Sequence, residues 1–199
     1  MSKNILICGV GGQGTVLAAK VLSQAAISNG ERVLSAETIG MAQRGGSVTS
    51  HVRIGSGIFS PLIPKGGADM LIAFEASEAV RNMEYLKKDG IAIINLKAVQ
   101  PTTASLSGKT FDAYKMCEAF AKRKIQTIVI NADEMSRMLG SSKAVNMILL
   151  GVASKTGMIS KKEIVDAIKM LVKPEFLELN QKAVEAGAGV FVLTQKSGK

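Results

Sequence analysis

The chain has few of the residues that proteins use to hold metals. Among its 199 residues are two cysteines and one histidine. Cys8 and Cys117 lie far apart and fit no metal-ligand spacing, so we expect both to be core thiols. An iron–sulfur cluster normally takes four thiolates, which this chain does not supply by itself. A histidine-based zinc site is equally disfavoured, because His51 is the one histidine.

Aromatic residues are also scarce, at 4% of the chain, and tryptophan is absent. The formal net charge is +9, which favours anionic partners such as phosphorylated ligands or an acidic protein. The lysines are spread along the chain, with no basic stripe that alternates with aromatic residues. Nucleic acid is therefore not the expected partner.

Long apolar runs are missing as well. No stretch of 18 uninterrupted apolar residues occurs, so we expect no membrane span. Residues 1–4 lead directly into an apolar run and lack the features of a signal peptide, which predicts a cytoplasmic protein. The 47% of apolar residues is enough for a well-filled core. Without repeats or linkers, residues 1–190 are expected to form a single domain and residues 191–199 a tail.

The most prominent local motif is a glycine-rich turn, Gly9–Gly14, with the sequence GVGGQG. An apolar run at residues 3–8 precedes it and a long apolar stretch at residues 15–28 follows, which predicts strand, turn and helix. The spacing fits G-x-G-x-x-G, in which glycines allow close backbone approach and a free helix N-terminus holds an anion. The same glycines also permit a tight strand–helix crossover without a ligand, and the turn alone leaves both interpretations open.

A second expected strand, at residues 32–36, completes a βαβ unit and is followed by Glu37. In a dinucleotide-binding fold, an acidic residue near this position holds the ribose hydroxyls. Glu37 can also be an ordinary carboxylate of a loop, without a role in binding ribose. We favour this interpretation because the next residues indicate a different site.

Those residues form a polar, glycine-rich loop over 37–47, at the carboxyl end of the expected strand, where open α/β sheets bind ligands. Arg44 lies beside Gly45 and Gly46, a grouping that presents a guanidinium and backbone amides to a phosphate or carboxylate. The alternative is a solvated loop with one surface arginine. The candidate binding residues are Gly9, Gly11, Gly12, Gln13, Gly14 and Thr15 of the turn, and Glu37, Arg44, Gly45, Gly46 and Ser47 of the loop; no catalytic residue and no metal ligand is identified.

The next segment alternates between apolar and polar residues and predicts a half-exposed antiparallel strand over 47–54. A glycine turn at residues 55–57 and a return strand over 58–63 would make a short antiparallel hairpin. His51, in the first of these strands, is interpreted as a surface or hydrogen-bonded histidine rather than a catalytic one.

Further apolar strands alternate with helices, which predicts an α/β fold: a Rossmann-like, mostly parallel sheet flanked by helices, with a helical C-terminal third. The segment 142–154 is apolar on too many sides for a surface helix, so it is either deeply buried or an interface. Residues 190–193 are apolar and are candidates for docking on a neighbouring surface. The other expected strands cover 70–74, 91–96 and 127–130; the other helices cover 76–88, 112–123, a short stretch that ends near 140, 160–172 and 174–186; and residues 97–110 are a loop.

In the 76–88 helix, the spacing places Ala76, Val80, Met83 and Leu86 on the buried face and Ser77, Glu78, Arg81 and Glu84 outside. Asn131 or Asp133 can cap the short helix, Ser160 and Glu163 form a capping box for the next helix, and Pro174 begins the last one.

Three blocks occur in order along the chain: the turn at 9–15, the stretch AETIGMAQRGGSV at 36–48, and SPLIP at 60–64, which is followed by Ala68-Asp69 and by AFE at 73–75. Together they resemble the gamma domain of 2-oxoacid:ferredoxin oxidoreductases, and most closely the small beta subunit of indolepyruvate ferredoxin oxidoreductase. The resemblance covers the whole chain, and its middle block is far more specific than the glycine turn.

The resemblance implies a role in oxidative decarboxylation of 2-oxoacids to acyl-CoA and CO2, with electrons passed to ferredoxin. It places thiamine diphosphate and 4Fe-4S clusters on a large alpha subunit and makes CoA a co-substrate, which the gamma domain helps to receive as it closes the site. This chain would then be a non-redox subunit that binds no cofactor alone, is inactive alone and reaches ferredoxin through the complex. The alternatives are a free-standing Rossmann-type NAD(P)-binding enzyme, motivated by the turn and Glu37, and a scaffolding module without chemistry of its own.

Overall fold

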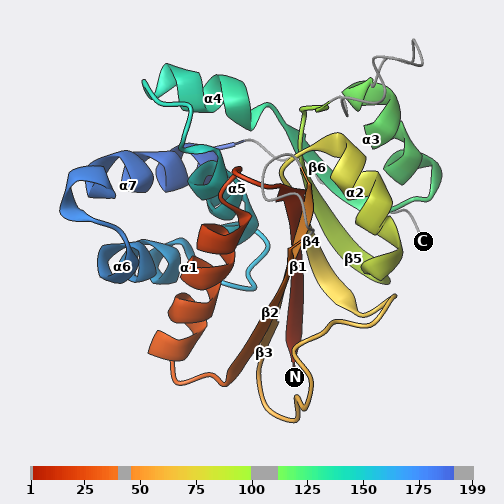
Figure 1. Ribbon diagram of the computed structural model, residues 1–199, viewed down its shortest axis with the longest axis horizontal. Helices are drawn as coiled ribbons and strands as arrows, with labels where there is room; N and C mark the ends of the chain where they lie inside the picture. Colours follow the sequence, from red (N-terminus) through yellow and green to blue (C-terminus); the bar gives the residue numbers. More distant parts are fainter. Residues whose placement is uncertain (1, 40–45, 100–111, 191–199) are drawn as a thin grey trace.

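A computed structural model describes residues 2–39, 46–99 and 112–190 of the chain, which form a six-stranded sheet between layers of helices (Figure 1). The strands lie in the order β2-β3-β1-β4-β5-β6. Their bounds are β1 Lys3–Val10, β2 Val33–Ile39, β3 Ser47–Ile54, β4 Ala68–Ala73, β5 Leu86–Asn95 and β6 Gln126–Ile130. The helices are α1 Thr15–Ser28, α2 Ala76–Asn82, the short 3-10 helix η1 Met83–Tyr85, α3 Ala113–Lys122, α4 Ala132–Met138, α5 Val145–Ser154, α6 Lys161–Leu171 and α7 Pro174–Ala188.

Five of the six strands run in the same direction, because β1, β4, β5 and β6 pair in parallel and β2 and β1 are both antiparallel to β3. The predicted mostly parallel α/β sheet is confirmed. The predicted βαβ unit is wrong in one respect, because β3 lies between β1 and β2 and the two strands are not neighbours.

Helices cover both faces of the sheet. In Figure 1, α1, α5, α6 and α7 lie on one side of the strands, and α2 and α3 lie on the other. Alternate residues of β1 enter separate cores: Ile5 and Ile7 pack with the first group of helices, and Leu6 and Cys8 pack with the second. This two-sided burial explains the continuous apolar strands. No described helix has both the length and the apolar composition needed to cross a membrane.

The predicted return strand at residues 58–63 is wrong. After β3 the chain has no regular structure until β4, although Ile58 and Ile63 are buried. The guanidinium of Arg53 donates to the carbonyl oxygens of Ser60, at 2.8 Å, and Leu62, at 3.3 Å. The Arg53 side chain therefore occupies two carbonyl oxygens that would otherwise accept hydrogen bonds from a neighbouring strand. Strand β3 is also more buried than predicted: it lies between β2 and β1, Val52 and Ile54 pack in the same core as α1, and His51 packs against Tyr85.

The predicted helix at residues 76–88 is too long and its buried face was misplaced. Helix α2 ends at Asn82, and β5 begins at Leu86. Glu78, predicted to face outward, is only 2% exposed, whereas Val80 is 40% exposed. Periodicity alone failed here because the Glu78 carboxylate is hydrogen-bonded inside the protein, as described below.

The C-terminal third is helical, as predicted. The cap at Asn131, the capping box of Ser160 with Glu163, and the proline at the start of α7 are all present. Residues 146–153 of α5 are buried within the chain, so the segment is a core helix; its alternative use as a subunit interface is wrong. The predicted loop at 97–110 lies mostly outside the described residues, and the tail at 191–199 does so entirely.

Helices α5 and α7 approach each other at two glycines. A Cβ atom on Gly187 would lie 2.0 Å from the carbonyl oxygen of Ile148, and one on Gly151 would lie 2.2 Å from the carbonyl oxygen of Val184. Both obstacles are backbone atoms, which no rotamer change can remove. Glycine at these two positions therefore sets the spacing of the two helices.

Substitution Gly187→Ala should lower the free energy of unfolding by about 1–3 kcal/mol, because it overpacks the contact between α5 and α7. Gly189→Ala is the matched control, since its Cβ atom would come no closer than 3.4 Å to another atom. The control should change stability by about 0.5 kcal/mol or less. Urea denaturation of both variants checks this, and equal stability of the two would contradict the proposed steric limit.

Candidate functional site

The glycine turn follows β1 at the carboxyl edge of the sheet, and it is held by its own hydrogen bonds. The Val10 amide donates to Gln13 Oε1 at 2.9 Å, and the Gln13 amide donates to the Val10 carbonyl at 3.2 Å. Gly12 and Gly14 have φ angles of 95° and 87°, in the left-handed region that favours glycine. A Cβ atom on Gly9 would lie 2.6 Å from Gln13 Oε1. The backbone of the turn therefore requires glycine at positions 9, 12 and 14, as expected for a tight strand–helix crossover.

The turn is joined directly to the end of the 37–47 loop. The Gly11 amide donates to the Gly46 carbonyl at 2.9 Å, and Val10 pairs with Ser47 across β1 and β3. The glycine turn and the end of the predicted loop, at Gly46 and Ser47, are therefore in direct contact. Arg44 and Gly45 lie outside the described residues.

Glu37 lies apart from the turn. It belongs to β2 rather than to a loop, its side chain is exposed, and it pairs with Ser50 of β3. The whole width of β3 separates it from β1. In a dinucleotide-binding fold, the strand with the ribose-binding acid lies directly beside β1. The arrangement here does not reproduce that geometry.

Helix α1 begins at Thr15, which is buried, with Gly14 as its N-cap. No described side chain caps this end of the helix, and its first turn contains no acidic residue. The first-turn amides have no partner within the helix, so they carry the positive end of the helix dipole. The amides of Gly12 and Gly14 also donate to no described backbone or side-chain acceptor. A helix N-terminus with free amides of this kind can bind an anion.

A groove of about 540 Å³ runs along this end of α1. Its walls combine the bare backbone of the turn, the apolar side chains of Val16, Leu17 and Val48, and the exposed ammonium of Lys20. Such a surface fits a ligand with an anionic group and an apolar portion. The groove is lined by Gly11, Gly12, Gly14, Thr15, Val16, Leu17, Lys20 and Val48.

A buried carboxylate fixes the start of β3 beside the turn. The Ser47 hydroxyl donates to Glu78 Oε2 at 2.6 Å, and Arg81 Nη1 lies 2.8 Å from Glu78 Oε1. Asn82 Nδ2 donates to the Glu78 backbone carbonyl at 2.9 Å. Neighbouring Glu75, also buried, accepts from the Val99 amide at 2.9 Å. The C-terminal end of the loop that contains the candidate residues is thus hydrogen-bonded to α2, through Ser47 and Glu78.

A second polar network joins the ends of β4 and β5 to α4. Asn95 Nδ2 donates to the Phe74 carbonyl at 3.0 Å and to Asp133 Oδ2 at 2.6 Å, and Asn95 Oδ1 accepts from the Ala132 amide at 2.9 Å. Lys97 Nζ lies 2.6 Å from Asp133 Oδ1. Sequence reasoning missed this network, although Asn95 ends an apolar strand at the same edge as Glu75, which was a usable signal.

Neither the buried thiol nor the imidazole is poised for chemistry. Burial raises the pKa of Cys8 well above its usual value, and the carboxylates of Glu78 and Glu75 raise it further, so Cys8 remains a neutral thiol. Burial lowers the pKa of His51, whose Nδ1 accepts from the Ile63 amide at 3.1 Å. Of the two interpretations of His51, the hydrogen-bonded one is confirmed and the surface one is wrong, because the residue is only 5% exposed. In residues 2–39, 46–99 and 112–190, no group of three His, Cys, Asp or Glu side chains is placed to hold a metal ion.

The Asp133 network should make stability depend on pH. Burial by itself would raise the pKa of Asp133, but hydrogen bonds from Lys97 and Asn95 outweigh it and hold the pKa below its usual 3.8. A lowered carboxyl pKa contributes stability that is fully present above the unfolded value and is lost as pH falls through the folded value. Asp133→Asn should therefore cost about 1–2 kcal/mol at pH 7 and progressively less below pH 3.8.

Urea denaturation of the native and Asp133→Asn chains between pH 7 and pH 3 measures this difference. Asp166→Asn is the control, since its ion pair with Lys169 is exposed and should contribute little in moderate salt. A difference for Asp133→Asn that stays constant down to pH 3 would contradict the assignment.

Comparison with known proteins identifies the family. Residues 4–190 match the family described as pyruvate ferredoxin/flavodoxin oxidoreductase. Indolepyruvate oxidoreductase subunit IorB of Archaeoglobus fulgidus is 37% identical over 192 residues, which cover 94% of each chain. The protein of the same name from Thermococcus kodakarensis is 32% identical over 188 residues, covering 92% of this chain and 93% of the relative.

Solved structures show the same fold. The gamma subunit of a keto/oxoacid ferredoxin oxidoreductase from Geobacter sulfurreducens superposes with a TM-score of 0.66 at 25% identity, over 93% of this chain and 95% of its own. A 2-oxoglutarate:ferredoxin oxidoreductase chain from Magnetococcus marinus gives 0.72 at 19% identity, over 94% of this chain and 30% of its own, which supports the fold alone. A match over almost the whole length, together with relatives above 30% identity, shows that the chain belongs to the pyruvate ferredoxin/flavodoxin oxidoreductase family.

Proposed function

We propose that the chain is the non-redox small subunit of a 2-oxoacid:ferredoxin oxidoreductase whose substrate is indolepyruvate or another aryl pyruvate. The main support for this proposal is the 37% identity, over 94% of both chains, with a protein named indolepyruvate oxidoreductase subunit IorB. The assembled enzyme would convert the oxoacid and CoA to acyl-CoA and CO2 and pass two electrons to ferredoxin.

The chain's own chemistry supports a non-redox role. Its two cysteines lie on different elements, Cys8 in β1 and Cys117 in α3, and burial raises the pKa of both thiols. Two such thiols do not make a cluster site with four thiolates. Thiamine diphosphate and the 4Fe-4S clusters would therefore be held by a large alpha subunit, and the chain would be inactive alone.

The contribution of this chain would be to bind and orient the co-substrate at the groove of α1. The amides of Gly12, Gly14 and the first turn would hold a phosphate of CoA, with the Lys20 ammonium close to the same anion. The apolar walls would contact the uncharged part of CoA. Arg44 and Gly45 are proposed as further phosphate contacts, because the loop that carries them ends at Gly46, which is bonded to the turn. Covering the partner's reaction centre in this way would also exclude water from reactive intermediates.

A free-standing NAD(P)-binding enzyme is the second candidate, since the free N-terminus of α1 after G-x-G-x-x-G also suits a pyrophosphate. The position of Glu37 beyond β3 argues against it. Calorimetric titration of the isolated chain with NADH separates the two: micromolar binding would favour the second candidate and would contradict the first.

Co-expression with a large subunit that binds thiamine diphosphate should give a stable complex that reduces ferredoxin when supplied with indolepyruvate and CoA. The small chain alone should show no activity. Size-exclusion chromatography with a ferredoxin-reduction assay measures both expectations. If the large subunit alone were fully active, the proposed role would be overturned.

Within the complex, Arg44→Ala should raise the KM for CoA about tenfold with little change in kcat, as expected for the loss of one charge-assisted contact. Arg32→Ala is the matched control, because Arg32 is an exposed arginine just before β2, at the opposite edge of the sheet. Steady-state kinetics at varied CoA concentration make the comparison. Unchanged kinetics of Arg44→Ala in an intact complex would instead indicate a scaffolding chain.

A further inference from the structure

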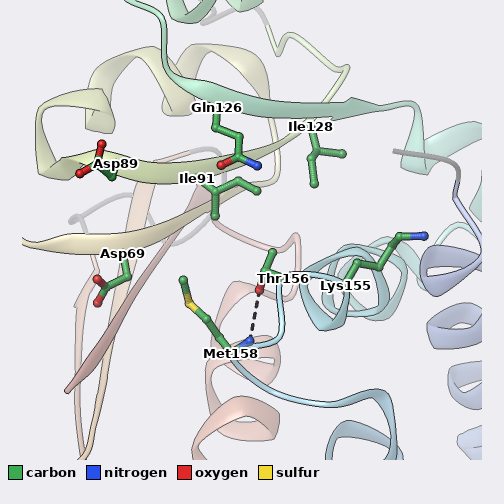
Figure 2. Close-up of a pocket in the computed structure, with 8 residues that line it drawn as sticks. All are labelled: Asp69, Asp89, Ile91, Gln126, Ile128, Lys155, Thr156 and Met158. Carbon is green, nitrogen blue, oxygen red and sulfur yellow. Dashed lines mark hydrogen bonds between the residues drawn. The ribbon is translucent and has the colours of Figure 1, made fainter. Parts of the chain in front are cut away.

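A second cavity, of about 430 Å³, lies at the opposite edge of the sheet from the glycine turn. The first residues of β4 and β6, the middle of β5 and the connection between α5 and α6 surround it. Figure 2 shows its lining residues projecting from these segments. They are Asp69, Asp89, Ile91, Gln126, Ile128, Lys155, Thr156 and Met158.

The lining has an apolar part and an acidic part. Ile91, Ile128 and Met158 supply the apolar surface. Asp69 and Asp89 lie together on one side of the view in Figure 2, and Ile128 and Lys155 lie on the other. The Asp69 carboxylate already accepts from the Asn4 amide and from Lys87. Asp89 is exposed and forms no ion pair with any described residue. The cavity therefore offers an apolar surface on one side and, on the other, the Asp89 carboxylate, which suits a segment that is apolar at one end and cationic at the other.

The described part of the chain ends at this cavity. Lys155 Nζ donates to the carbonyl oxygens of Ala188, at 3.1 Å, and Val190, at 2.7 Å. The same lysine lines the cavity, and in Figure 2 it lies on the opposite side of the view from Asp69 and Asp89. The last described residue, Val190, is thus bonded to a side chain of the cavity wall.

The nine residues that follow have the sequence FVLTQKSGK. Three apolar residues come first, and two lysines, Lys196 and Lys199, come last. An extended stretch of nine residues reaches up to about 30 Å. Apolar and cationic residues therefore follow Val190 in the same order as the apolar and acidic surfaces of the cavity.

We propose that residues 191–199 dock in the cavity of their own chain, with the apolar residues 191–193 against Ile91, Ile128 and Met158, and with Lys196 and Lys199 beside Asp89. Attachment at Val190 makes the binding intramolecular, which gives the segment a high effective concentration at this surface. The segment would cover a part of the sheet near β6, which stands at the end of the order of the described strands.

Disulfide trapping in the full-length chain tests the docking. A Gln126→Cys and Ser197→Cys pair keeps every proposed apolar and charged contact, and Gln126 lines the cavity. Lys20→Cys with Ser197→Cys is the control, because Lys20 is exposed on α1 outside the cavity. Under mild oxidation, the monomeric crosslink of the cavity pair should form at least fivefold faster than that of the control.

Charge reversal provides the second readout. Lys196→Glu with Lys199→Glu should slow trapping of the cavity pair severalfold, and adding Asp89→Lys should restore the rate. Equal rates for the cavity and control pairs would overturn the proposal. A crosslink that forms only between two chains, or only after the large subunit is added, would overturn it as well and would assign the surface to a second copy or to that partner.

Discussion

The antiparallel pairing of β3 with β1 is the constraint on which the carboxyl edge of the protein depends. The two strands pair along their whole length, from Lys3 with Ile54 to Val10 with Ser47. This register brings Gly46 and Ser47, at the start of β3, beside the glycine turn, where the Gly11 amide donates to the Gly46 carbonyl. The same insertion of β3 keeps β2 away from β1. One pairing therefore assembles the composite site and excludes the usual position of a ribose-binding acid.

The packed helices behind the turn hold it in place. Asn146 of α5 lies beneath Gly14, where an added Cβ atom would come within 2.9 Å of its side-chain nitrogen. Helix α5 is itself positioned by its close contact with α7, which requires Gly151 and Gly187. The geometry of the turn thus depends on helix packing far along the chain. A small domain gains precision at a binding edge in this way, since packed interiors have few voids and transmit small displacements.

The sequence was informative where local chemistry decides the structure. Apolar runs, the glycine turn, the capping box at Ser160 and the proline at the start of α7 located the strands and helices well, because each acts through neighbouring residues. The resemblance to the oxidoreductase family was also confirmed. The errors lie where distant residues decide. Arg53 takes the carbonyls of the segment predicted as a return strand, and Glu78 is buried because Ser47 and Arg81 bond to it. Neither partnership is visible in a periodic pattern.

The candidate site divides in the same way. Position at the carboxyl ends of strands correctly placed the turn and the end of the loop at one edge, but it also suggested that Glu37 would lie there, and it does not. The Asn95 network was missed because its members, Lys97 and Asp133, are far apart in the sequence and have no common motif. Sequence patterns locate the carboxyl ends of the strands. Which side chains contact one another there depends on the order of the strands in the sheet, which the patterns do not give.

The glycine motif illustrates how a structural cause and a functional cause can be separated. Steric contact at Gly9 and left-handed backbone at Gly12 and Gly14 explain the glycines without any ligand. The motif therefore carries no argument for binding by itself. The backbone amides do favour binding: those of Gly11 and Gln13 are used within the protein, whereas the first turn of α1 opens into a groove with no described cap. The amides of the first turn of α1 have no acceptor within the helix, and these free donors favour an anionic co-substrate at this edge.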